Sequence, residues 1–140
     1  MTATEVVALC TRWQEAIRRH DFTAAAEFYS ENAEIHSPLA GSITGREGFL
    51  KASDAFVGAF PEATYVFESP IVCEDRAAVI ADISAHHVGP LMGLAPTGRT
   101  IHFTIVFALD IRDGAIVRDR RIYDFTGMLV QAGVLKAKPA

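Results

Sequence analysis

The stretch from Arg99 to Asp124 constrains the fold of this chain more than any other. Arg99 to Ile111 alternates apolar with polar residues and is rich in β-branched and aromatic side chains, which is typical of a half-buried strand. Asp113-Gly114 is a strong hairpin-turn signal, and Ala115 to Asp124 predicts the returning antiparallel strand. The apolar face of this hairpin must be covered by other elements of the chain.

Helical patterns fill the first 60 residues. Thr2 and Glu5 have the spacing of a capping box and precede an apolar stripe that includes Trp13. Asp21 is a natural N-cap for a second, short helix. Thr44 and Glu47 form a second possible capping box at the start of a third helix, and Pro61 ends that helix. A brief strand over residues 33–36 is expected before it.

Strand patterns replace the helical ones from residue 63 onward. We expect strands over residues 65–73, with Pro70 marking an edge or a bulge, and over residues 76–88. Residues 89–98 predict a loop, and residues 125–135 a short closing helix. Helices followed by strands predict one α+β domain over residues 1–140, with N-terminal helices packed across the concave face of a curved antiparallel sheet. Such a cone is a default small-molecule site.

Charge and composition exclude several classes of partner. The net charge of −4 argues against nucleic-acid binding, which needs a surplus of Lys and Arg. The N-terminus lacks a signal-peptide pattern, and no apolar run approaches the roughly 18 residues of a membrane span. Cys10 and Cys73 lack any paired or metal-type spacing, so we expect both to be reduced in a cytoplasmic protein.

The histidines do not predict a metal site. They occur singly or as neighbours, and neighbours on a strand point to opposite faces, so His86 and His87 cannot both bind one ion easily. We expect no metal and no cofactor.

Short motifs run through nearly the whole chain. They are Trp13-Gln14-Glu15-Ala16, His20-Asp21, Phe28-Tyr29-Ser30-Glu31-Asn32-Ala33, His36-Ser37-Pro38, Gly45-Arg46-Glu47, Phe60-Pro61, His87-Val88-Gly89, Pro96-Thr97-Gly98-Arg99, Asp113-Gly114 and Gln131-Ala132-Gly133. In this order and spacing, the chain resembles a SnoaL-like, or polyketide-cyclase-like, domain of the nuclear-transport-factor-2-like superfamily. The resemblance implies a cone-shaped α+β fold and a homodimer formed through the outer face of the sheet. Because the superfamily also includes isomerases, epoxide hydrolases, dehydratases and binding modules, the fold alone does not give the function.

Two turn types fit Asp113-Gly114 and give opposite faces. A two-residue type I′ turn pairs Arg112 with Ala115 and places the apolar side chains Phe103, Ile105 and Phe107 on one face with Arg118, Arg120, Ile122 and Asp124. A type I turn with a glycine bulge pairs Ile111 with Ala115 and places them instead with Val117, Asp119, Arg121 and Tyr123. A slip of one residue turns every side chain over.

The resemblance favours the bulge and also shows a departure. In SnoaL-like cyclases this strand carries two acids; the second matches Asp124, and the first, the proton-transfer carboxylate, matches Arg121. The catalytic histidine of the family matches Phe107. Both usual catalytic positions are therefore substituted.

The substituted positions still suggest chemistry. A guanidinium does not accept a proton at neutral pH, but Arg121 can stabilise an enolate or bind a substrate carboxylate. Asp119 is then the proposed general acid or base, or else merely the ion-pair partner of Arg121. Tyr123 is a supporting donor, whereas Asp124 is expected to cap the last helix.

The predicted substrate-binding residues are Trp13, His87, Phe103 and Phe107. If the side chains of the strand over residues 76–88 alternate so that His87 points into the pocket, Asp82 points outward. If they alternate the other way, Asp82 becomes a second inward carboxylate.

Three functions stay open. The first is an acid–base enzyme of the cyclase or isomerase type that acts on an apolar oxygenated substrate, such as a polyketide- or steroid-like ketone. The second is a non-catalytic ligand-binding or interaction module. The third, an epoxide hydrolase of the limonene type, requires Asp82 to face Asp119 across Arg121.

Overall fold

The computed structural model describes residues 1–136, which form an α+β fold. Three helices come first, α1 (Ala3–Arg18), α2 (Phe22–Ala26) and α3 (Gly45–Ala59), and α4 (Phe125–Gln131) follows the last strand. The strands are β1 (Tyr29–Ser37), β2 (Gly41–Thr44), β3 (Thr64–Phe67), β4 (Ile71–Cys73), β5 (Arg76–His86), β6 (Thr100–Arg112) and β7 (Ala115–Ile122). The predicted α+β class is confirmed.

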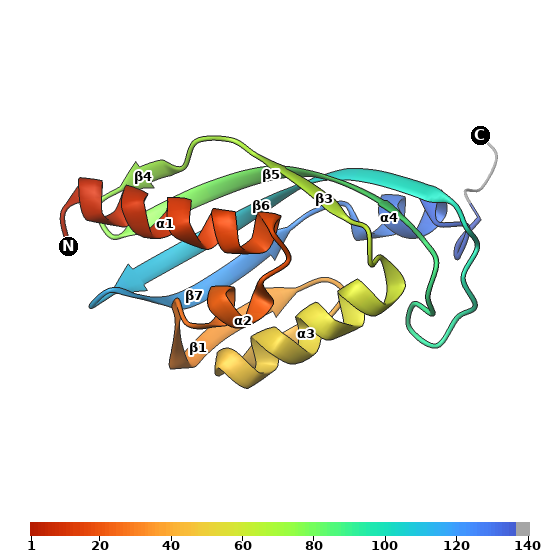
Figure 1. Ribbon diagram of the computed structural model, residues 1–140, viewed down its shortest axis with the longest axis horizontal. Coiled ribbons are helices and arrows are strands. Elements are labelled where there is room, and N and C mark those ends of the chain that lie inside the picture. Colours follow the sequence, from red (N-terminus) through yellow and green to blue (C-terminus); the bar gives the residue numbers. More distant parts are fainter. Residues whose placement is uncertain (137–140) are drawn as a thin grey trace.

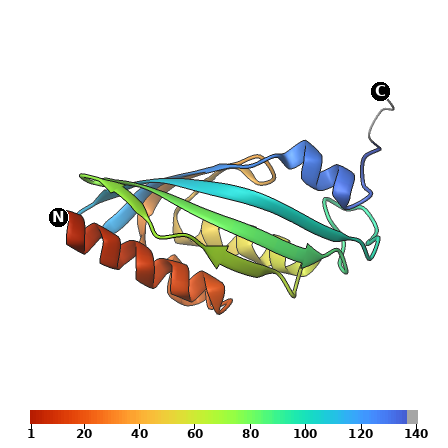
Figure 2. The same cartoon turned by 90° about the horizontal axis from the view of Figure 1, so that it is seen from above.

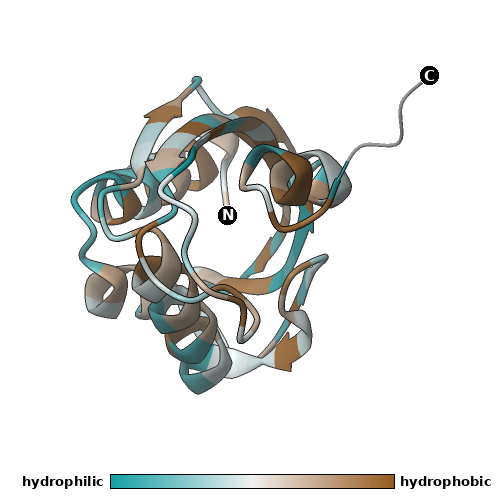
Figure 3. Ribbon diagram, turned by 90° about the vertical axis from the view of Figure 1, so that its right-hand side faces the viewer, coloured by the Kyte–Doolittle hydropathy of each residue, from teal (hydrophilic) through white to brown (hydrophobic). Residues whose placement is uncertain are grey.

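One curved sheet holds all the strands. Its order is β2-β1-β7-β6-β5-β3, and β4 pairs with β5. Helices α1, α2 and α3 lie along one side of this sheet, while α4 follows β7 and packs beside the first residues of β6, far from the N-terminus (Figures 1 and 2). Seen end-on, the sheet and the three N-terminal helices surround a common interior (Figure 3). The core fills this interior with aliphatic and aromatic side chains from both layers.

The sheet is mixed, not wholly antiparallel as expected. β1 runs parallel to β7, with Ile35 opposite Asp119, and the register between these strands shifts between Tyr29 and Glu34. The brief strand predicted at residues 33–36 is thus a nine-residue strand. It is long because it pairs with β2 on one edge and with β7 on the other.

The helix ends follow the predicted caps at three of four positions. Thr2, Asp21 and Asp124 each accept a hydrogen bond from a backbone N–H in the first turn of their helix. Thr44 makes no such bond, so the second capping box was wrong. The extended strand expected over residues 65–73 is two strands, because the segment around Pro70 leaves the ladder.

Candidate functional site

A cavity lies between the inner face of the sheet and the N-terminal helices. The space open to the centre of a water molecule is about 70 Å³, enough for several waters or a small ligand group. The wall is mainly apolar, and its polar groups come from one arginine, two tyrosines and two serines. The lining residues are Ile17, Phe22, Ser37, Leu39, Ala40, Phe49, Ala52, Ser53, Phe56, Tyr65, Ile83, Phe103, Ile105, Phe107, Arg121 and Tyr123.

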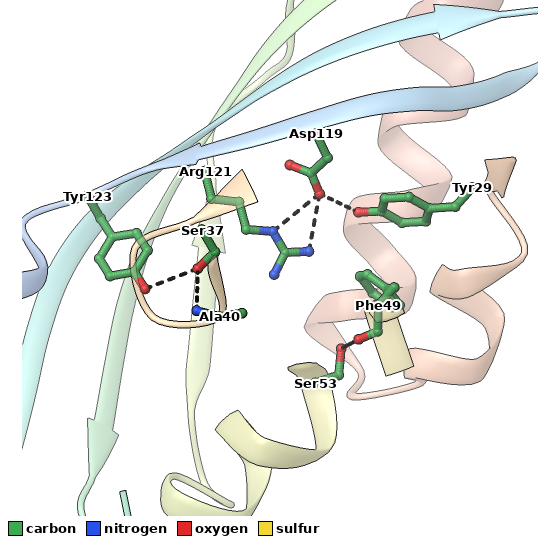
Figure 4. Close-up of polar contacts among 8 residues, drawn as sticks. All are labelled: Tyr29, Ser37, Ala40, Phe49, Ser53, Asp119, Arg121 and Tyr123. Carbon is green, nitrogen blue, oxygen red and sulfur yellow. Dashed lines mark hydrogen bonds and ion pairs between the residues drawn. The ribbon is translucent and has the colours of Figure 1, made fainter. Parts of the chain in front are cut away.

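Arg121 supplies the cationic group of this cavity. Its Nε and Nη2 both donate to Oδ2 of Asp119 at 3.2 Å. Its guanidinium carbon lies 5.5 Å from the ring centroid of Phe49 and 5.3 Å from that of Phe107, so two aromatic rings flank the charge. Nη1 points away from Asp119 and makes no hydrogen bond within residues 1–136 (Figure 4). This nitrogen is free to bind a ligand oxygen.

Asp119 lies behind Arg121 and is fully buried. Oδ2 accepts a third hydrogen bond, at 2.6 Å, from the hydroxyl of Tyr29, while Oδ1 makes none among the described residues. The carboxylate is held in the centre of the sheet, because its strand pairs with β6 on one side and β1 on the other. A buried carboxylate is tolerated here because it is both hydrogen-bonded and paired.

Burial and charge act together on this network. Burial raises the pKa of Tyr29 well above its ordinary value, and the adjacent Asp119 carboxylate raises it further, so the phenol stays protonated. Burial by itself would lower the pKa of Arg121, but the carboxylate of Asp119 outweighs that effect and raises it. The guanidinium is therefore permanently charged.

Tyr123 lies at another part of the cavity wall, beside the β1–β2 turn. Its hydroxyl oxygen accepts from the backbone N–H of Leu39 at 3.2 Å and lies 3.4 Å from Oγ of Ser37 (Figure 4). Its ring packs against Phe103, with centroids 5.2 Å apart. The hydroxyl proton of Tyr123 can therefore serve Ser37 or a ligand.

The structure brings together most of the predicted site residues. Phe103, Phe107, Arg121 and Tyr123 line the cavity, and Asp119 contacts it only through Arg121. Asp124 is the N-cap of α4, as expected.

Two predicted substrate-binding residues lie outside the lining. Trp13 is buried between α1 and the sheet, where its ring meets the edge of Phe107 at a centroid distance of 4.9 Å. His87 is buried near Phe60, and its Nδ1 accepts from the backbone N–H of Thr97 at 3.2 Å. Trp13 thus supports the wall from behind, and His87 fastens the loop that follows β5.

The side chain of Asp82 points outward from the sheet. It is exposed and accepts from the hydroxyl of Thr104 at 2.6 Å, whereas its neighbours Ala81 and Ile83 are buried. The Asp–Arg–Asp set that an epoxide hydrolase would require is therefore not formed, and that hypothesis is withdrawn.

Tyr29 and Phe49 are the functional neighbours that the sequence did not identify. Both belong to apolar stripes that read as ordinary core, and Tyr29 is 90 positions from Asp119. Only the parallel pairing of β1 with β7 brings Tyr29 to the carboxylate.

Residues 1–136 lack two further features. No group of three His, Cys, Asp or Glu side chains is placed to hold a metal ion in this part of the chain. None of its helices is long and apolar enough to cross a membrane.

The comparisons with known proteins agree with this architecture. AclR from Streptomyces galilaeus, a candidate hydroxylase, has 26% identity and a TM-score of 0.83 over 99% of this chain and 87% of its own. IdmH from Streptomyces antibioticus, a candidate polyketide cyclase, has 28% identity and a TM-score of 0.76 over 91% of this chain and 98% of its own. A candidate SnoaL-like polyketide cyclase from Jannaschia sp. CCS1 shares the fold, with 20% identity and a TM-score of 0.82 over 98% and 95% of the two chains.

The sequence comparisons define the family. No curated protein sequence matches the chain. The sequence model of the SnoaL-like polyketide cyclases, however, matches residues 7–132, which is most of its length. The chain belongs to the SnoaL-like polyketide cyclase family.

Proposed function

We propose that this protein is an acid–base enzyme of the cyclase or isomerase type that acts on an apolar oxygenated molecule, such as a polyketide- or steroid-like ketone. The observation that carries the proposal is the position of Arg121. Its unpaired Nη1 faces an apolar, aromatic-lined cavity, where a hydrogen bond to a ligand oxygen is stronger than in water.

The proposed reaction begins with a ketone whose oxygen accepts a hydrogen bond from Nη1 of Arg121. Removal of a proton from the adjacent carbon moves charge onto that oxygen, and the fixed guanidinium stabilises the enolate. Asp119 is the proposed proton acceptor, because its Oδ1 makes no hydrogen bond to the described residues. Since this carboxylate is buried behind Arg121, the transfer requires a rearrangement on ligand binding that brings the substrate carbon within reach of Oδ1. Tyr123 is the proposed second donor to ligand oxygens.

A non-catalytic binding module is the second candidate. The observation that favours it is the burial of Asp119 behind Arg121, since no carboxylate from the described part of the chain lines the cavity. Such a protein would hold the same ketone through Arg121 without transferring a proton.

Exchange of the α-protons of 1-indanone in D₂O, followed by proton NMR, separates the two candidates. The wild-type protein is expected to accelerate exchange, and Asp119→Asn to lower the catalysed rate at least about 100-fold while ligand shifts persist, since a general base contributes at least that factor. Arg121→Leu is expected to lose both binding and exchange. Saturable binding to the wild type without exchange would support the module, and absence of binding would contradict both candidates.

The homodimer and the cytoplasmic location belong to the same proposal. The outer face of the sheet presents Val66 and Ile122, which are 66% and 58% exposed, and such apolar surface is typical of an interface. Sedimentation analysis is expected to give a dimer for the wild type and a monomer for Val66→Asp/Ile122→Asp. An unchanged mass for the double variant would argue against this interface. Fractionation of the producing cells checks the location.

A further inference from the structure

We propose that Asp119 makes this cavity selective for neutral carbonyl compounds over carboxylates of the same size. Asp119 is then a specificity-determining residue that acts through Arg121. The inference rests on the proposed function, because it assumes that ligands bind at Nη1 of Arg121.

The charges of the site balance. The guanidinium of Arg121 is matched by one carboxylate, at 3.2 Å from two of its nitrogens. Tyr29, which donates to the same carboxylate, is a neutral hydroxyl, and among residues 1–136 none of the other cavity-lining side chains is charged at neutral pH. The site therefore has no net charge, although it contains an arginine.

A carboxylate ligand would upset this balance of charge. A second anion would bring its charge into an apolar cavity that already contains the Asp119 carboxylate, so the site would become a net anion out of water. The Nε–Nη2 edge of Arg121, which is one of the edges used for bidentate carboxylate binding, is already used by Oδ2 of Asp119. Arg121 is thus already partnered by a carboxylate of its own chain.

A neutral carbonyl ligand preserves the balance of charge. A ketone or amide oxygen accepts the hydrogen bond of Nη1 and leaves the net charge at zero. Its apolar body can lie against Phe103, Phe107 and the other aromatic residues of the wall. The geometry favours this class, and removal of the Asp119 charge should weaken or abolish the preference.

Three probes of matched size test the inference: acetophenone, benzamide and benzoate. Their dissociation constants at pH 7.5 are measured by NMR titration for the wild type, Asp119→Asn and Tyr29→Phe. Asparagine keeps an oxygen acceptor at the same place and removes the charge, whereas Tyr29→Phe removes a hydrogen bond to Asp119 and keeps the charge. Thermal unfolding confirms that each variant is folded.

Acetophenone and benzamide are expected to bind the wild type at least about tenfold more tightly than benzoate, the lower limit for a like charge a few ångströms away. In Asp119→Asn the affinity ratio of benzoate to acetophenone should rise at least about tenfold. In Tyr29→Phe the order of the three probes should not change.

The other outcomes are distinct. Benzoate binding to the wild type as tightly as acetophenone would overturn the inference and leave the proposed function standing, and this result needs no variant. An unchanged ratio in folded Asp119→Asn would also overturn it. Binding of none of the probes to the cavity would overturn the inference and the proposed function together.

Discussion

At the scale of single residues, the central feature is a pair of charges two positions apart on one strand. Asp119 and Arg121 point to the same face because strand side chains alternate, and this face is the interior. Both charges lose water there, so each depends on the other. The alternation made their shared direction predictable from the sequence, but the hydroxyl of Tyr29 that completes the network was not.

Loss of one member of the pair should cost more than loss of both. Asp119→Ala leaves the guanidinium of Arg121 unpaired, and we expect the free energy of unfolding to fall by about 3–5 kcal/mol. Asp119→Ala/Arg121→Met removes both charges and should recover a large part of that loss.

Urea unfolding followed by circular dichroism measures both variants, with Tyr29→Phe as the matched control that keeps both charges. A double variant that is no more stable than Asp119→Ala would mean that the two charges do not depend on each other.

At the scale of elements, the β6–β7 hairpin combines the two alternatives that the sequence left open. Arg112 pairs with Ala115 across a two-residue turn in which Asp113 and Gly114 both have positive φ. A bulge then follows, since Ile111 pairs with Ile116 but Asp110 pairs with Arg118. The predicted glycine bulge at the turn was therefore wrong, whereas the predicted inward direction of Asp119, Arg121 and Tyr123 was right.

This result shows the limit of turn rules. Asp-Gly selects the turn, but it does not say where along the ladder an extra residue is accommodated. Ile116 and Asp119 are both buried, although strict alternation along the strand would place them on opposite faces. The extra residue of the bulge must therefore lie between them.

Deletion of Val117 tests the bulge. Because this residue has no partner across the β6–β7 ladder, its removal should leave Asp119 opposite Leu109 and preserve a cooperative thermal transition. Deletion of Arg120 is the matched control, since it moves Arg121 opposite Ala108 and turns it outward. Equal loss of the transition in both deletion variants would contradict the assigned bulge.

Gly89 joins the loop after β5 to the end of α3. Val88 and Gly89 both donate to the carbonyl of Ala59, and a Cβ on Gly89 would lie 1.8 Å from the carbonyl oxygen of Gly58. Gly89→Ala should therefore lower the free energy of unfolding by about 1–3 kcal/mol, the usual cost of overpacking.

Gly58→Ala is the control for Gly89→Ala, because a Cβ there meets no atom within 4 Å and helices favour alanine. It should leave stability unchanged or raise it slightly in urea unfolding. Equal stabilities of the two alanine variants would contradict the close approach at Gly89.

At the scale of the whole molecule, the buried core makes stability depend on alkaline pH. Burial raises the pKa of Cys10 from 9.0 to about 11. Above pH 9 the unfolded thiol loses its proton while the folded one keeps it, so the unfolded state binds fewer protons and stability falls as pH rises. The loss between pH 9 and 11 should reach about 2–3 kcal/mol.

Urea unfolding at several pH values measures this slope. Cys10→Ala should flatten it, whereas Cys73→Ala, at the exposed cysteine, should leave it unchanged. A wild-type slope that persists fully in Cys10→Ala would assign the loss to other groups, such as the buried Tyr29 phenol.

The sequence predicts the order of elements better than it predicts their neighbours. Periodicity, caps and turn residues locate nearly every helix and strand, because these signals are local. The parallel pairing of β1 with β7, and the cavity that it closes, depends on contacts between the two ends of the chain. Local sequence patterns do not specify which distant strands pair with each other.

The same pairing has a consequence for the time course of folding. β1 is made early in synthesis, yet its partner β7 ends at Ile122, so the edge of β1 that pairs with β7 has no partner until β7 has left the ribosome. Contacts of such long sequence separation slow folding and leave apolar strand edges exposed meanwhile. The Tyr29–Asp119–Arg121 network should therefore form late in folding, after β7 has been made.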